Sequence, residues 1–347
     1  MQEIIVSKRE EGGTLYKLLK KYLREAPDSF LYKMLRKKNI VLNGKKAEGR
    51  EKLTEGDSIR LFLSDGTIQQ FGGGIKPDGK DCLAGQDYQK VNDGAIKEEK
   101  QPEILYEDGD ILFLNKPAGW LVQKAECGDF SLNEWMISYL LKKGEITPEE
   151  LLTFRPGICN RLDRNTSGIV AAGKTMAGLQ FLSEAFREHR LHKYYTCIAV
   201  GEIAKPVLAQ GYLVKDGRAN RVKVFSAPPS GEGAVQYIKT AYRPLLVRNG
   251  FTYLEVELFT GKTHQIRAQL ASDGHALLGD AKYMDDFCGK LRDKYRVKSQ
   301  LLHAGRIVFE NAGERFSYLD GREFIAGEPA EFERIKKMLG LEEKEGG

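Results

Sequence analysis

The first 65 residues combine apolar and basic positions in a pattern that begins helical and becomes strand-like. In residues 14–23, leucines and a tyrosine recur every three or four positions with lysines between them, which predicts an amphipathic helix. A second apolar stripe over residues 31–35 predicts another short helix. Asn43-Gly44 is a strong hairpin signal, and residues 53–63 predict a closing strand.

The pattern is lost between residues 66 and 102, where glycines and polar residues follow neither a helical nor a strand period. This composition predicts a flexible linker. Apolar runs resume at residue 103. The elements predicted there are a hairpin over 104–114, helices over 132–140 and 175–189, a strand over 194–200 and an alternating strand over 251–259.

Strands and helices interleave irregularly over residues 103–330, without a regular βαβ repeat. This favours an α+β fold with a mixed or antiparallel sheet. Residues 331–347, rich in Glu and Lys, predict a C-terminal helix that ends in a tail. A chain of 347 residues, at roughly 150 residues per domain, agrees with a small helical unit over 1–65 and a larger domain over 103–330.

Positive charge is concentrated in the small unit. Residues 1–65 contain fifteen Lys or Arg and ten Asp or Glu, and this excess of five equals the net charge of the whole chain, +5. The rest of the chain is therefore neutral overall. A basic module attached to a neutral domain indicates a docking site for a polyanion, although a solvated helical face gives the same pattern.

Several classes of protein are disfavoured by composition. No run of about 18 apolar residues is present, so no membrane-spanning helix is expected. The N-terminus lacks a basic region followed by an apolar stretch, so we expect no secretion signal. The five cysteines are scattered and form no Cys-x-x-Cys pair, which favours neither a disulfide framework nor a zinc site. We therefore expect a cytoplasmic protein with no metal.

One stretch in the middle of the larger domain carries candidate chemistry. In Arg161-Leu162-Asp163-Arg164, a carboxylate stands between two guanidinium groups, and Thr166-Ser167-Gly168 and an apolar run follow. Neighbouring positive charge favours the ionised form of a carboxylate, which can then act as nucleophile, base or electrostatic partner. Alone, the pattern is equally compatible with an ion-paired surface turn.

Three further stretches join this motif. They are His192-Lys193-Tyr194-Tyr195 at the start of an apolar strand, Gly261-Lys262-Thr263-His264-Gln265-Ile266-Arg267 after a strand, and Gly274-His275-Ala276-Leu277-Leu278-Gly279-Asp280 with Leu302-His303-Ala304 downstream. Alone, Tyr195 is as easily a core aromatic residue, and Arg267 an ordinary ion-pair residue. We expect His264 and His303 to be structural and His192 to lie on the surface or face RNA.

The N-terminal unit resembles the small RNA-binding domain named after ribosomal protein S-four. The resemblance rests on the two short helices, the basic corner and the Asn-Gly turn. In that family the second helix and the following turn contact RNA. The resemblance therefore implies RNA-backbone contacts, which add affinity and salt sensitivity more than sequence choice. The implied residues are Arg36, Lys37, Lys38, Asn43 and Lys45.

The ordered set of motifs in the larger domain resembles the RluA-type pseudouridine synthases, a family that includes enzymes of large-subunit ribosomal RNA. The resemblance implies that Asp163 is the catalytic aspartate, that Arg267 pairs with it, and that Tyr195 stacks on the target uracil and takes the carbon-5 proton. The isomerisation needs no cofactor. Large-subunit ribosomal RNA is the implied substrate and partner, with transfer RNA as the alternative.

The same resemblance implies how RNA is held. The target uridine is flipped out of its stack, at a cost of a few kcal/mol, and Arg161 fills the vacated space. Arg164 and Lys193 complete the predicted RNA contacts of the larger domain. The family usually has His before Arg-Leu-Asp, whereas this chain has Asn160, which weakens any inference about contacts made by that side chain.

Two rival functions stay open at this point. A non-catalytic RNA-binding or ribosome-assembly factor would share the scaffold, but its catalytic residues would be lost. A glycosidase shares carboxylate attack at an anomeric carbon and needs a second carboxylate about 5–10 Å from the first. Glu255 and Glu257 are the candidates for that role, and neither lies in a motif.

Overall fold

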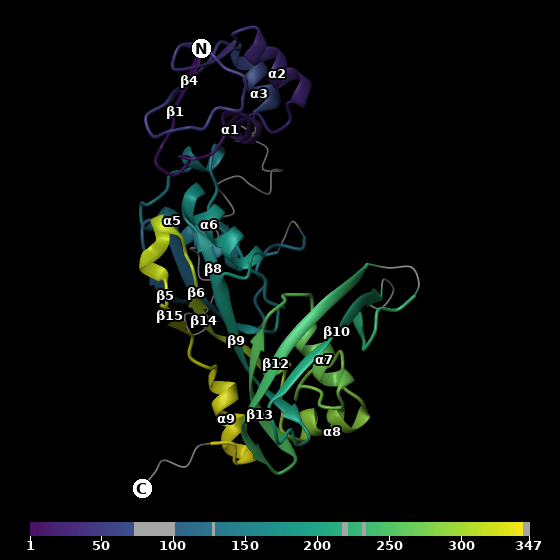
Figure 1. Cartoon of the computed structure of the whole chain (residues 1–347). Coiled ribbons are helices and arrows are strands. Elements are labelled where there is room, and N and C mark those ends of the chain that lie inside the picture. The colour runs from purple at the N-terminus through teal and green to yellow at the C-terminus, as the bar shows by residue number, and fades with distance from the viewer. Residues whose placement is uncertain (73–100, 127–128, 217–220, 231–233, 343–347) are drawn as a thin grey trace.

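The structure, a computed structural model, describes residues 1–72, 101–126, 129–216, 221–230 and 234–342. Figure 1 shows an elongated molecule with the N-terminal unit at one end and the C-terminal helix near the other. The fold is α+β, as predicted, and a large mixed sheet forms the body of the larger domain. None of the helices in these ranges is long and apolar enough to cross a membrane.

The N-terminal unit contains a sheet that the sequence analysis only partly predicted. Its strands are ordered β1-β4-β2-β3 and pair antiparallel, so the unit is α+β and the helical description is wrong. The strands are β1 (Gln2–Ile5), β2 (Ile40–Leu42), β3 (Lys45–Lys46) and β4 (Ser58–Leu61). Helices α1 (Leu15–Tyr22) and α2 (Asp28–Arg36) carry the predicted apolar stripes.

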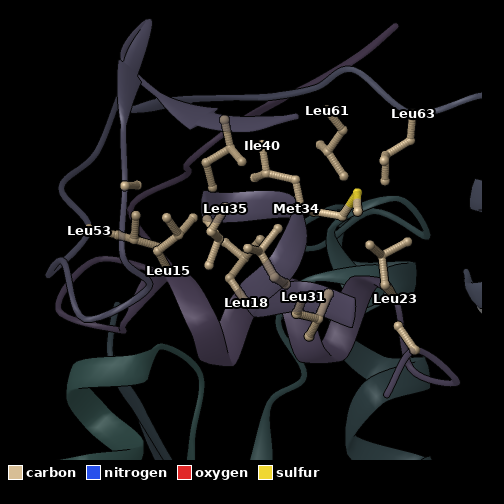
Figure 2. Packing of buried hydrophobic residues seen from close by; sticks show 14 of the residues in the cluster. Leu15, Leu18, Leu23, Leu31, Met34, Leu35, Ile40, Leu53, Leu61 and Leu63 are labelled. Atoms are coloured by element: carbon tan, nitrogen blue, oxygen red, sulfur yellow. The ribbon is translucent and has the colours of Figure 1, made fainter. Parts of the chain in front are cut away.

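These stripes meet the sheet in one core. Figure 2 shows Leu15, Leu18, Leu31 and Leu35 from the two helices packed beneath Ile40, with Leu61 nearby. Burying each such side chain contributes roughly 1.5–3 kcal/mol relative to exposure. The unit therefore has a hydrophobic core of its own.

The unit extends past the predicted boundary at residue 65. Helix α3 (Asp65–Phe71) is capped by Ser64, whose hydroxyl accepts a hydrogen bond from the Thr67 amide at 3.2 Å. Ile68 and Phe71 pack on the core, and the Phe71 ring lies 4.7 Å from the Phe30 ring. Residues 66–71 are therefore helix and not linker. Most of the predicted linker, residues 73–100, lies outside the described residues.

The larger domain is built on an 11-stranded sheet whose main path is β11-β10-β12-β13-β9-β14-β8-β6-β5, with β15 paired to β14 and β7 to β8. The strands are β5 (Glu103–Glu107), β6 (Ile111–Lys116), β7 (Gly157–Ile158), β8 (Ser167–Gly173), β9 (Leu191–Val200), β10 (Val207–Asp216), β11 (Arg221–Phe225), β12 (Val235–Arg248), β13 (Phe251–Leu258), β14 (Leu302–Phe309) and β15 (Glu323–Ile325). The predicted hairpin and the predicted alternation of β13 are confirmed.

Helices cover this sheet. They are α5 (Leu132–Lys142), α6 (Met176–Arg187), α7 (Gln265–Ser272), α8 (Asp286–Lys294) and α9 (Ala330–Leu339), with short 3₁₀ turns at Glu150–Leu152 and Glu314–Leu319. Helix α9 is the predicted C-terminal helix. Its apolar face, Phe332, Ile335 and Leu339, is buried with Ile198 of β9, so α9 belongs to the core of the larger domain.

The one parallel pairing on the main path, β8 with β14, lies at the centre of the sheet. It brings Gly168 against Ala304, where a Cβ atom on residue 168 would lie 2.3 Å from the Ala304 carbonyl oxygen. Gly168 also has a φ of 115°, so only glycine fits. The Thr-Ser-Gly turn thus allows β8 to enter the sheet directly after the Asp163 loop.

A short segment before α1 joins the two units. The Arg9 guanidinium donates a hydrogen bond to the Lys174 carbonyl at 3.1 Å, and the Met176 amide donates to the Arg9 carbonyl at 2.8 Å. The neighbouring Glu10 carboxylate is buried and accepts a hydrogen bond from the Thr153 hydroxyl. The N-terminal unit is therefore docked on the larger domain close to the start of α6.

Candidate active site

The motifs of the larger domain converge on one cleft of about 1140 Å³. Its walls are the loop between β7 and β8, strand β9, and the start of α7. It is lined by all six site residues that the sequence analysis assigned to this domain: Arg161, Asp163, Arg164, Lys193, Tyr195 and Arg267. Segments separated by more than one hundred residues therefore form a single site.

Asp163 is held in place by the backbone on both sides of it. Its carbonyl accepts a hydrogen bond from the Thr166 amide at 3.0 Å. Before it, the Asn160 side chain accepts a bond from the Ala171 amide at 2.8 Å and donates to the Ile169 carbonyl at 3.1 Å. Asn160 thus ties the loop to β8, a task that needs an acceptor and a donor but no charge.

A buried ion-pair network binds the Asp163 carboxylate. Arg267 donates through Nη1 to Asp163 Oδ2 at 2.7 Å, and through Nε and Nη2 to the two oxygens of Asp280 at 2.7 and 2.9 Å. One planar guanidinium therefore bridges two carboxylates, a geometry that lysine cannot reproduce. Burial opposes the charge of Arg267, but its hydrogen bonds to Asp280 and Asp163 outweigh burial, and the pKa of Arg267 rises.

The two arginines next to Asp163 in sequence do not pair with it. Arg164 donates through Nε to the Gly119 carbonyl at 3.1 Å, and both Arg164 and Arg161 are exposed in the cleft wall. The ion-pair partner of Asp163 within the described ranges is Arg267. Nε2 of His264 lies 3.7 Å from Asp163 Oδ2, but burial lowers the pKa of His264. The guanidinium groups of Arg161 and Arg164 are thus exposed where a ligand in the cleft can contact them.

Helix α7 is fixed where it presents Arg267. Gln265 donates to the Lys239 carbonyl at 3.2 Å and to the Thr240 hydroxyl at 2.9 Å on β12. Its side-chain oxygen also accepts a bond from the Lys262 amide at 3.1 Å. The motif's glutamine therefore anchors the helix, and the arginine two positions later faces Asp163.

Tyr195 on β9 is buried, with 9% of its surface exposed at the cleft. Burial and the nearby charge of Asp163 raise its pKa, so the phenol stays protonated near neutral pH. Lys193, two residues earlier on the same face, has its pKa lowered to about 8 by burial. It has no ion-pair partner within the described chain.

Four residues at or near the site received no catalytic or binding role from the sequence. Asp280 is the second carboxylate of the network, and its Oδ1 also accepts a bond from the Lys282 amide at 2.9 Å. His264 was expected to be structural, but it lies in the cleft, with Nδ1 2.9 Å from the Tyr283 hydroxyl. His303 is structural as expected, bonded to Ser167 and Ala326 inside the core.

The fourth of these residues is Lys116 at the end of β6, which is fully buried. Its ammonium donates to the carbonyls of Pro117, Trp120 and Arg164 at 3.1, 3.0 and 3.0 Å. Burial lowers the pKa of Lys116 to about 7, and the charge of Asp163 opposes this change. Lys116 thereby holds the backbone on the C-terminal side of Asp163.

The second carboxylate that a glycosidase needs is not supplied by the candidates. Glu255 pairs with Arg243 at 2.7 Å and Arg306 at 3.0 Å, and Glu257 contacts His192 at 2.8 Å. Neither glutamate lines the cleft. No cluster of His, Cys, Asp and Glu suited to a metal ion occurs among the residues that the structure describes.

The predicted RNA contacts of the N-terminal unit lie outside the cleft. Arg36, Lys37, Lys38 and Lys45 are exposed around the end of α2 and on β3. Asn43 differs from them, because its amide donates to Asp57 at 2.8 Å and accepts from the Ser58 amide at 2.9 Å. Asn43 has a φ of 50°, so its observed role is to form the turn.

Comparisons with known proteins agree with this site. A sequence profile described as RNA pseudouridylate synthase matches residues 110–272. Ribosomal large subunit pseudouridine synthase D of Neisseria meningitidis serogroup A is 28% identical over 315 residues, which cover 88% of this chain and 75% of that protein. Ribosomal large subunit pseudouridine synthase C of Vibrio vulnificus is 27% identical over 315 residues, covering 89% and 88%.

The fold has a counterpart among solved structures. Human RNA Pseudouridylate Synthase Domain Containing 4 superposes with a TM-score of 0.54 at 20% identity, covering 74% of this chain and 96% of that one. This likeness concerns the fold. The profile match and the two bacterial relatives show that the chain is similar to RNA pseudouridylate synthases, the family that its RluA-type motifs indicated.

Proposed function

We propose that this enzyme isomerises specific uridines of large-subunit ribosomal RNA to pseudouridine, with Asp163 as the catalytic carboxylate. The observation that carries the proposal is the buried Asp163–Arg267–Asp280 network at the bottom of a cleft lined by exposed cations. Ribosomal RNA is favoured because both bacterial relatives are named for the large ribosomal subunit. With that substrate, we expect the enzyme to act in the cytoplasm.

In the proposed reaction, Asp163 attacks the target nucleotide at the anomeric carbon or on the base. The bond from N1 to the sugar breaks, the uracil turns within the cleft, and a bond from C5 to the sugar forms. The bond to Asp163 breaks as well, which returns the free carboxylate. The proton leaves C5, and N1 ends protonated. Electrons and atoms balance within the nucleotide, so the scheme uses no cofactor. Arg267 keeps the Asp163 carboxylate in one orientation through its 2.7 Å contact.

We assign Tyr195 to stacking against the uracil in the flipped-out position. An aromatic ring at the cleft wall offers a flat apolar face, and the raised pKa of the phenol keeps it neutral. A neutral phenol is a weak proton acceptor, so the raised pKa favours stacking over removal of the C5 proton. Arg161, exposed beside Asp163, is assigned to the space that the uridine vacates.

The substrate class is tested by mapping pseudouridine in RNA from cells with and without this gene. Carbodiimide labelling followed by primer extension gives a stop at each pseudouridine. Loss of stops at specific large-subunit positions is the expected result. Loss of stops only in transfer RNA would replace the proposed substrate. An unchanged map, with no second enzyme covering the same sites, would contradict the proposed activity and favour an RNA-binding assembly factor.

A further inference from the structure

A second, smaller pocket of about 370 Å³ opens beside the main cleft. The two share Asn165, Arg267, Lys282 and Gln300 in their walls. A nucleotide chain that places one base in the main cleft therefore has a continuous path into the second pocket. The motifs that form the main cleft assign no function to this second pocket.

Three cations surround the second pocket, each from a different segment. Arg221 is the first residue of β11, Lys282 lies between α7 and α8, and Lys298 lies between α8 and β14. None of them has an ion-pair partner among the residues described. Asp280 is completely buried and accepts hydrogen bonds from Nε and Nη2 of Arg267. Among the residues that the structure describes, no ion pair therefore neutralises the three cations of the pocket.

The backbone that carries these cations is tied to the catalytic network. The Val222 amide, next to Arg221, donates to the Tyr283 hydroxyl at 3.0 Å. Asp280 Oδ1 accepts the Lys282 amide, so the carboxylate that orients Arg267 also fixes the backbone at residue 282. The pocket and the catalytic carboxylate are therefore held in one geometry.

The loop before β14 is equally constrained. Gly279 packs so closely against Ser299 that a Cβ atom on residue 279 would lie 2.2 Å from the Ser299 carbonyl oxygen. The Leu301 amide donates to the Leu278 carbonyl at 2.9 Å. This contact fixes the backbone beside Lys298, which lines the same pocket as Lys282.

Like charges held together in this way repel each other. Burial, then the charge of Arg267 and more weakly that of Arg221, lower the pKa of Lys282, while the charges of Asp163 and Asp280 oppose this change. Such repulsion costs free energy in the empty protein and is relieved by an anion between the charges. Arginine and lysine together suit a phosphate, since guanidinium forms paired hydrogen bonds and ammonium acts as a point charge.

We propose that the second pocket binds a backbone phosphate of the RNA strand next to the target nucleotide, through Arg221, Lys282 and Lys298. This inference rests on the proposed function for the identity of the ligand. A phosphate held here, while the target nucleotide lies over Asp163, fixes the direction in which the RNA strand leaves the cleft. The pocket would therefore set the register of the strand.

The test is equilibrium binding of an unmodified large-subunit ribosomal RNA transcript to the full chain at several salt concentrations. The variant is the double substitution Arg221→Gln and Lys298→Gln, whose positions line only the second pocket. Each phosphate contact contributes about 0.7–0.9 to the slope of log affinity against log salt. We expect the slope of the variant to be shallower by about 1 to 2 and affinity at low salt to fall about tenfold.

The matched control is the double substitution Lys205→Gln and Lys337→Gln, which removes the same charge from exposed positions outside both pockets. The control should keep the wild-type slope. A pocket variant with the wild-type slope, or with no greater loss than the control, would overturn the proposal.

The same transcript is then treated with wild-type enzyme and mapped for pseudouridine. If uridines are modified and the pocket variant keeps the wild-type slope, the phosphate site is wrong and the proposed function stands. If no uridine is modified but the slope falls in the pocket variant alone, the phosphate site stands and the proposed function fails. The two ideas therefore fail by different readouts.

Discussion

The N-terminal unit and the active-site cleft both depend on cationic side chains, but they place them in opposite environments. Around the end of α2, Arg36, Lys37 and Lys38 are exposed and have no acidic partner within the described chain. In the cleft, the Arg267 side chain is 8% exposed and lies between two carboxylates. Exposed charges interact through salt-screened solvent, whereas buried pairs are screened far less.

This difference separates two tasks. Exposed cations exchange counter-ions for RNA phosphates, so they add affinity that falls with salt. A buried guanidinium is already paired, so it adds no such affinity, but it holds a reacting carboxylate in one orientation. Changes at the two regions should therefore affect different measurements, and the predictions below test that separation.

The largest expected effect is on turnover, from Asp163→Asn. The amide keeps the size of the side chain, but it is neither a nucleophile nor a charged partner for Arg267. We expect the single-turnover rate of pseudouridine formation to fall at least about a thousandfold. Equilibrium affinity for RNA, measured on the same preparation, should stay near wild type. Turnover close to wild type would remove Asp163 from its assigned role.

The next largest effect is expected from Asp280→Ala, which should lower the free energy of unfolding. Arg267 would lose its two-point partner inside the protein, and breaking a buried ion pair costs about 3–5 kcal/mol. Urea unfolding should report that loss together with reduced turnover. The control is Glu323→Ala, which breaks an exposed pair with Arg306 and should cost less than about 1 kcal/mol. Equal losses in the two variants would contradict the contrast between buried and exposed charge.

A smaller effect, on binding alone, is expected from neutralising the basic corner. Substituting Gln for Arg36, Lys37, Lys38 and Lys45 together should make the salt slope of RNA affinity shallower by about 3, since each phosphate contact contributes about 0.7–0.9. The rate at saturating RNA should not change, because these residues lie outside the cleft. An unchanged slope would show that the N-terminal unit does not dock RNA.

The parts of the site that the sequence predicted are those carried by local motifs. Asp163, Tyr195 and Arg267 stand in short patterns, and the structure brings all three to one cleft. Asp280, the partner of Arg267, ends the Gly274–Asp280 stretch. Its contact with Arg267 depends on how the segment after α7 folds back. Lys116 could not be singled out from the sequence, since nothing local indicates that three carbonyls would surround its ammonium.

The fold shows the same division between local and distant causes. Helices α1 and α2 and strand β13 follow from strong periodic patterns. Helix α3 was missed because its apolar residues are few and a glycine run follows it, so its cap at Ser64 and its packing on Phe30 decide it. Strand β1 is short and mostly exposed, and pairing with β4 defines it.

The contact between the N-terminal unit and the larger domain gives a prediction of about 2 kcal/mol. Arg9→Ala removes the hydrogen bonds to the Lys174 and Glu145 carbonyls and the ion pair with Glu150, and each such hydrogen bond contributes about 1 kcal/mol. We expect the N-terminal unit to separate from the larger domain more often, which small-angle scattering would report as a larger radius of gyration. Lys8→Ala, at an exposed neighbouring position, is the control. Identical scattering from the two variants would show that Arg9 does not hold the units together.

The smallest expected effect concerns His192, which lies between Glu257 at 2.8 Å and Glu310 at 3.0 Å on the surface near the cleft. Hydrogen bonding to Glu257, opposed by some burial, raises its pKa. A group whose pKa is higher in the folded chain stabilises the fold fully below its unfolded pKa, about 6.5 for histidine, and that contribution is lost as pH rises through the folded pKa. An NMR titration should therefore place His192 above 6.5, and Glu257→Gln should lower its pKa. The buried His303, whose pKa burial lowers, should titrate on the other side of 6.5. If His192 and His303 titrated together, exposure and pairing would not distinguish the ionisable groups of the larger domain, and the contrast between buried and exposed charge would lose its physical basis.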